Sequence, residues 1–144
     1  MTAPEIGALR QLAVRVLMHQ AGPDADAAAL AAAARRAYDE LARVVAPLIG
    51  QGGVDALTGR ALHLAQREYP WLVHEREPKQ AEGPFAQVFL CLEGQDPDVA
   101  TAAAGAVFAT FMGLLVTFIG EPLTAGLLRK AWPAAFSDAG TEET

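Results

Sequence analysis

The run VATAAAGAVFATFMGLLVTFIG (residues 99–120) contains no charged side chain over 22 residues. A transmembrane helix needs roughly 20 consecutive apolar residues, so this run is long enough to cross a bilayer. A helix that is apolar on every side is equally typical of the centre of a soluble bundle. The fold depends on which of the two applies.

Within the run, large side chains recur on one helical face, at Phe108, Phe111, Leu115 and Phe118. Small residues recur four apart on another face, at Gly105, Ala109 and Gly113. A face of large side chains fills the space between neighbours, and a face of small ones lets another helix approach closely. The pattern favours a buried core helix over a membrane span.

The rest of the chain is rich in helix boundaries and poor in strand patterns. Proline fits the first turn of a helix, and five prolines stand at such positions: Pro4, Pro23, Pro84, Pro97 and Pro122. The clearest start is Asp96-Pro97-Asp98, where the first Asp caps and the second lies near the positive end of the dipole. We predict helices over residues 4–19, 24–49, 54–69, 84–93, 97–119 and 122–132.

The predicted helix 24–49 carries a narrow apolar seam, at Leu30, Ala34, Ala37, Leu41, Val44 and Leu48. Arg36 and Glu40, four residues apart on its outer side, are spaced for an ion pair. Such amphipathic helices need an apolar surface to bury against. We therefore predict an all-α, compact bundle of five to six helices around the central helix at about 97–119, which forms an antiparallel hairpin with 122–132.

Length and composition indicate a single helical domain over 1–136, followed by an acidic, flexible tail over 137–144. The 144 residues are 52% hydrophobic and 19% charged, with a net charge of −6. This acidity disfavours duplex nucleic acid and anionic lipid as partners. Cys91 is the only cysteine, and no secretory signal pattern is visible, so we expect a cytoplasmic protein. The heavy use of alanine and glycine is typical of a bacterial source.

The sequence predicts no catalytic, cofactor or metal site. His19 stands at a predicted helix end, His63 lies among arginines, and His74 falls in a connector over 71–83. Cys91 has no activating base nearby, and the first serine is Ser137, in the tail. We therefore expect a protein that is not an enzyme.

One surface is a candidate for partner binding. Arg60, His63 and Arg67 are spaced three and four apart, on one face of the predicted helix 54–69, and Tyr69 and Trp71 follow. Arginine, tyrosine and tryptophan dominate the energetics of protein interfaces. An ordinary solvated helix face, with the aromatic side chains closing the end of the bundle, is the alternative.

Three classes of function fit these patterns. The first is an interaction or regulatory module that acts through protein–protein contacts or self-association. The second is a membrane-active protein of pore-forming type, conditionally membrane-associated, whose central hairpin inserts into bilayers. The third is a small-molecule sensor. Membrane insertion or a ligand pocket would use six residues of the central run: Gly105, Phe108, Ala109, Phe111, Gly113 and Phe118.

Overall fold

A computed structural model describes residues 3–22, 24–72 and 91–133, and within these ranges the chain is helical without strands. Its elements are α1 (Ala3–Ala21), α2 (Ala27–Ala65), the short 3-10 helix η1 (Pro70–Leu72), α4 (Pro97–Ile119) and α5 (Glu121–Ala131). The predicted all-α bundle is confirmed. Most of the expected connector and of the expected helix 84–93, together with the tail 137–144, lie outside the described residues.

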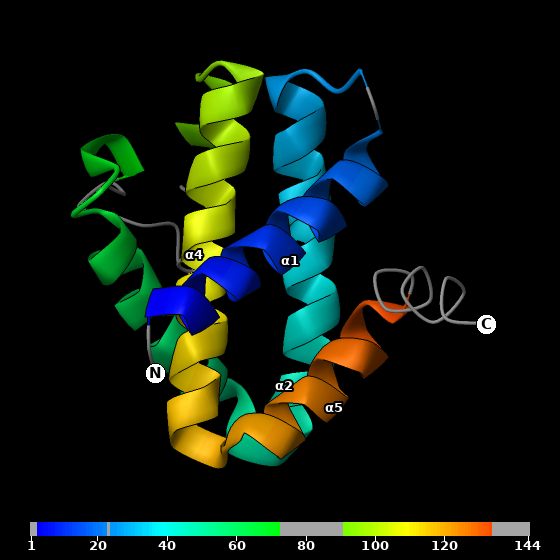
Figure 1. Cartoon of the computed structure of the whole chain (residues 1–144), viewed down its shortest axis with the longest axis vertical. Coiled ribbons are helices and arrows are strands. Elements are labelled where there is room, and N and C mark those ends of the chain that lie inside the picture. The colour runs from blue at the N-terminus through cyan, green and yellow to red at the C-terminus, as the bar shows by residue number, and fades with distance from the viewer. Residues whose placement is uncertain (1–2, 23, 73–90, 134–144) are drawn as a thin grey trace.

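Helix α4 is the predicted central helix, and it packs against α1, α2 and α5. In Figure 1 it runs along the length of the bundle, with α1 crossing over it and α5 at its lower end. Phe108, Phe111 and Leu115 are at most 3% exposed, as predicted for the face of large side chains. Asp96 occupies the cap position of α4, but its side chain makes no capping hydrogen bond.

The face of small residues on α4 receives α1. A Cβ atom added at Gly105 would lie 2.9 Å from Cγ2 of Val14, closer than real Cβ contacts. The two helix backbones therefore approach as closely as they do because residue 105 has no side chain. The close approach expected from the small residues is confirmed at this position.

Helix α2 differs from the sequence prediction, which placed a stop at residues 50–53. Gly50 alone leaves the helical conformation, with φ of 85° and ψ of 156°, and the helix resumes at residue 51. The chain therefore bends at one glycine that tolerates positive φ. Across this kink, the hydroxyl of Tyr38 lies 2.8 Å from Oγ1 of Thr58, which donates to the carbonyl of Val54. Since Thr58 has only one hydroxyl proton, Tyr38 is the donor between the two arms.

Helix α5 returns from the end of α4 toward the middle of the bundle. Gly120, with φ of 96°, makes the turn. After α5, the indole of Trp132 meets the ring of Phe108 edge-on, with centroids 6.0 Å apart, and its Nε1 donates to the carbonyl of Ala37 at 3.2 Å. Trp132 thereby joins α5 to both α4 and α2. The strictly antiparallel arrangement of α4 and α5 stays a prediction.

The predicted apolar seams of α4 and α2 each end in an exposed residue, at the same end of the bundle. Phe118 is 65% exposed, although Phe108, Phe111 and Leu115 on its face are buried. Leu48 is 48% exposed, and Val45 rather than Leu48 completes the buried part of α2 before the kink. Both predictions of burial were wrong, because the apolar seam continues at these two positions beyond the part of each helix that its neighbours cover.

Candidate functional site

The most unusual surface of the described chain is the apolar end, which we define as Leu48, Phe118 and Leu123. Leu123, in the first turn of α5, is 46% exposed. In Figure 1 the kink of α2, the end of α4 and the start of α5 lie together at the lower end of the bundle. Glu121 and Pro122 are exposed between Phe118 and Leu123 along the chain. Because exposed apolar patches mark interaction sites more often than scattered single side chains do, exposed apolar residues on three elements at one end are a candidate site.

The turn that presents the apolar end is held in one shape. The backbone N–H of Gly120 donates to the carbonyl of Val116 at 2.8 Å. The carbonyl of Gly120 in turn accepts from the backbone N–H and the hydroxyl of Thr124, at 3.1 and 2.8 Å. Thr124 is itself 1% exposed. Phe118 and Leu123 therefore project from a turn whose backbone bonds are satisfied locally.

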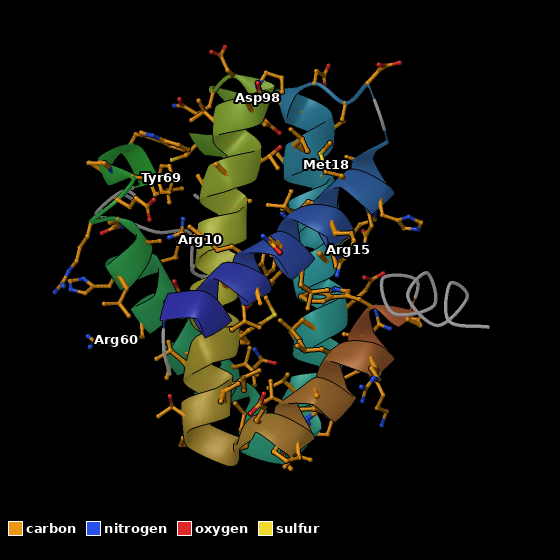
Figure 2. All side chains as sticks on the ribbon, viewed as in Figure 1. Arg10, Arg15, Met18, Arg60, Tyr69 and Asp98 are labelled. Carbon is orange, nitrogen blue, oxygen red and sulfur yellow. The ribbon has the colours of Figure 1, made fainter. Side chains whose placement is uncertain are left out.

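The predicted arginine surface lies on the arm of α2 beyond the kink. Arg60, His63 and Arg67 are all exposed, and Figure 2 shows Arg60 on the outside of the bundle. No residue in the described ranges forms an ion pair with Arg60 or Arg67. Tyr69 and Trp71 meet edge-on, 5.9 Å apart, and are half-buried against the core. The structure thus brings the three basic residues onto one open face and turns the two aromatic residues partly inward.

An ion pair fixes α1 beside this surface. Arg10 donates to both carboxylate oxygens of Glu68, at 2.6 and 3.3 Å. These hydrogen bonds hold the pKa of Glu68 below its usual value and raise the pKa of Arg10. Both side chains are more than one third exposed, so solvent screens the pair.

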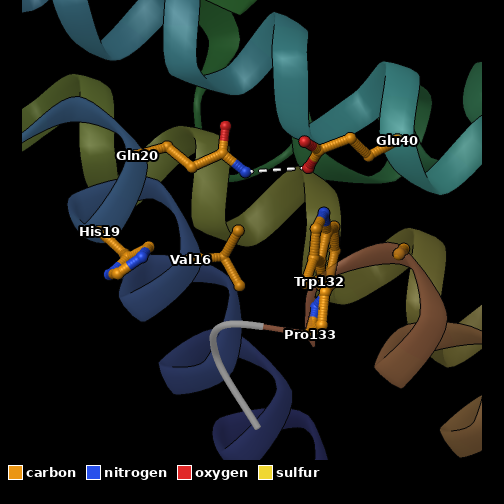
Figure 3. Close-up of a pocket in the computed structure, with 7 residues that line it drawn as sticks. Val16, His19, Gln20, Glu40, Trp132 and Pro133 are labelled. Carbon is orange, nitrogen blue, oxygen red and sulfur yellow. Dashed lines mark hydrogen bonds between the residues drawn. The ribbon is translucent and has the colours of Figure 1, made fainter. Parts of the chain in front are cut away.

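A cavity of about 260 Å³ opens between the ends of α1 and α5 and the middle of α2. Its walls come from Val16, His19, Gln20, Glu40, Ala131, Trp132 and Pro133. Figure 3 shows Glu40 and Gln20 on one side and the indole of Trp132 on another. A second, more apolar hollow of about 190 Å³ lies between α1, α4 and α5 and includes Val116 and Leu128.

The pocket considered beside the small residues of α4 does not form at Gly105, because Val14 fills that space. Phe108, Ala109 and Phe111 are buried, and Gly113 is half-buried. Among the described residues, no group of three or more His, Cys, Asp or Glu side chains is placed to hold a metal ion. His74 lies outside the described residues.

Comparison with known proteins gives no relative for this arrangement: no protein family, curated protein or solved structure matches the chain. Over the described ranges one helix, α4, is long and apolar enough to cross a membrane. The core helices of soluble proteins share this property.

Four residues that shape these surfaces carry no signal in the sequence that marks them as surface or cavity residues. Leu48 was assigned to the core, and Leu123 was not distinguished within its helix. Glu40 and Trp132 are 92 residues apart in the sequence, so no local pattern connects them. Only the packing of α5 on α2 brings them to one cavity.

Proposed function

We propose that this protein is a non-enzymatic interaction module that binds a protein partner through the apolar end. The single observation that supports this most strongly is the exposure of Phe118. Its side chain is 65% exposed, although Phe108, Phe111 and Leu115 on the same face of α4 are buried. A partner that covers Phe118 and Leu123 would gain roughly 1.5–3 kcal/mol for each large apolar side chain that it buries fully.

The charge of the same region favours a protein partner over a lipid surface. Glu121 lies exposed between Phe118 and Leu123, and the chain as a whole carries a net charge of −6. Burying a carboxylate in the headgroup region without a cation is unfavourable, and anionic lipids repel an acidic protein. A protein segment with an apolar anchor and a neighbouring Lys or Arg satisfies both features of the surface.

The test is affinity capture from a lysate of the source organism with matched variants. F118S/L123S removes the anchors, and M18S is the control, because Met18 is similarly exposed near the opposite end of the bundle (Figure 2). We expect one protein to be recovered in equal amounts with the wild type and with M18S. Its recovery should be at least tenfold lower with F118S/L123S. The purified partner should then bind E121K more weakly than the wild type.

Two results would overturn the proposal. Equal recovery with F118S/L123S would remove the apolar end as the binding surface. Loss only with R60A/R67A/W71A would transfer the role to the arginine surface.

Membrane activity is the second candidate, and the specific observation for it is the length and composition of α4. Liposome flotation and dye release test it directly, with neutral and anionic vesicles and at neutral and acidic pH. Flotation of the wild type that F118S/L123S abolishes, without any captured protein, would replace the proposed partner with a bilayer.

A further inference from the structure

We infer that the cavity between Glu40 and Trp132 is a binding site for a small organic cation with a flat or apolar body. This site is independent of the apolar end and goes beyond the proposed function. Its walls combine a carboxylate, an indole and apolar side chains from three helices. Its volume of about 260 Å³ falls just below the roughly 300 Å³ at which typical ligand pockets begin, which suits a small molecule.

The indole wall is fixed before any ligand arrives. Trp132 is 3% exposed, its Nε1 is bound to the carbonyl of Ala37, and its ring rests on Phe108. In Figure 3 the ring stands between Glu40 and Pro133, with one face toward Val16. An indole ring attracts cations through its quadrupole, and the small part of the Trp132 ring that borders the cavity offers a fixed apolar contact to a ligand.

The polar wall of the cavity is formed by the side chains of Glu40 and Gln20. Oε1 of Glu40 accepts from Nε2 of Gln20 at 2.9 Å, and no group within residues 3–22, 24–72 and 91–133 donates to its other oxygen. Oε1 of Gln20 is also buried without a partner in these ranges. Glu40 therefore offers an acceptor and a negative charge, which selects ligands that carry N–H donors and positive charge.

Arg36, four residues before Glu40, does not neutralise it. The sequence spacing permits an Arg36–Glu40 ion pair, but Arg36 instead donates to the backbone carbonyl of Gln20 at 3.0 Å. In the part of the chain that the structure describes, Glu40 forms no salt bridge. A ligand cation can therefore meet this carboxylate without displacing a bound arginine.

Benzamidine is a suitable probe, because it joins a flat ring to a forked cation with several N–H donors. Benzamide is its neutral counterpart of nearly the same shape, and benzoate is the anionic one. The readout is the indole N–H signal of Trp132 in ¹H–¹⁵N NMR spectra of the full-length protein. The indole signal of Trp71, which does not line the cavity, is the internal control, and W71F assigns the two signals.

We expect the Trp132 signal to shift with benzamidine concentration along a saturable curve. Benzamidine should bind at least tenfold more tightly than benzamide, and benzoate should have no effect. E40Q keeps an acceptor for Gln20 but removes the charge, so it should weaken benzamidine binding at least tenfold. D39N is the matched control, because Asp39 is an exposed neighbour that does not line the cavity. R36A should bind benzamidine at least as tightly as the wild type.

The inference fails if benzamide binds as well as benzamidine, or if E40Q binds benzamidine like the wild type. It also fails if millimolar benzamidine leaves the Trp132 signal in place. The side chain of E40Q is isosteric with that of the wild type, and circular dichroism monitors whether the variant folds. If its helical spectrum is intact, a loss of binding is caused by the removal of the charge. Capture of a partner through Phe118 and Leu123 is tested by different variants, so either proposal can fail alone.

Discussion

Replacing Gly105 with alanine should destabilise the protein, although alanine is the better helix former. Residue 105 is the place where α1 lies closest to α4, and the new Cβ would stand 2.9 Å from Cγ2 of Val14. Val14 is β-branched and stiff at χ1, so its methyl group cannot swing aside freely. Either Val14 leaves its rotamer or α1 moves away from α4.

The magnitude follows from two opposing terms. Overpacking a fitted contact costs about 1–3 kcal/mol. The change from glycine to alanine inside a helix raises the free energy of unfolding by about 1 kcal/mol. The net expectation for G105A is a loss of about 0–2 kcal/mol. G59A is the matched control, because Gly59 is exposed in α2 with no atom within 4 Å of an added Cβ. G59A should stabilise the protein by about 0.5–1 kcal/mol, so the two variants should differ by about 0.5–3 kcal/mol.

The assay is urea unfolding followed by far-ultraviolet circular dichroism, with stability compared at a constant m-value. The double mutant V14A/G105A isolates the contact, because V14A removes the methyl group that the new Cβ would meet. We expect a coupling of about 1–2 kcal/mol in the direction of rescue. If G105A stabilises the protein as much as G59A, or if the two substitutions are additive, the close approach of α1 at Gly105 is refuted.

Three further predictions concern the polar contacts that hold the helices together. T58V should cost about 1–3 kcal/mol in urea unfolding, because it leaves the Tyr38 hydroxyl without its acceptor across the kink, whereas T58S should be nearly neutral. W132F should cost about 1–3 kcal/mol by thermal unfolding, since it removes the bond from α5 to α2 and part of a buried ring. E68Q should lower stability at pH 7 by about 0.2–1 kcal/mol, since it weakens the pairing with Arg10. The pKa of Glu68 is lowered in the folded state, so the loss of stability in E68Q should be complete above the usual glutamate pKa near 4.3. The loss should vanish as the pH falls through the lowered pKa of the folded state. A loss of stability that is unchanged at pH 2 or in 1 M salt would contradict this prediction.

The sequence predicted the starts of α4 and α5 to within one residue, because local chemistry sets these boundaries. The position of Pro97 after Asp96 predicted the start of α4, and Pro122 after Gly120 predicted the start of α5. The burial of Phe108 and Phe111 followed from periodicity, since neighbours with apolar stripes were available to cover them. These predictions needed only spacing and the chemistry of single turns.

The surfaces were harder to predict, because they depend on how far each neighbour extends. Leu48 and Phe118 lie on correct core seams, yet these two positions lie beyond the part of each helix that its neighbours cover. Similarly, the spacing of Arg36 and Glu40 permits an ion pair, but Gln20 of another helix binds both side chains instead. Sequence spacing fixes the face on which a side chain lies, and only tertiary structure decides what meets that face.

The contacts that bury α4 also determine the cost of inserting it into a membrane. Inserting the whole helix would break the contacts of Phe108 with Trp132, of Phe111 with Tyr38 and of Gly105 with α1. Those contacts are the core, so insertion requires a free energy comparable to unfolding, about 5–15 kcal/mol for an ordinary domain. If the described bundle keeps its fold, the apolar end can still meet a bilayer, but its gain of a few kcal/mol is opposed by the desolvation of Glu121. We therefore expect vesicle binding only under conditions that also unfold the bundle, and flotation of the protein with its near-ultraviolet circular dichroism intact would contradict this argument.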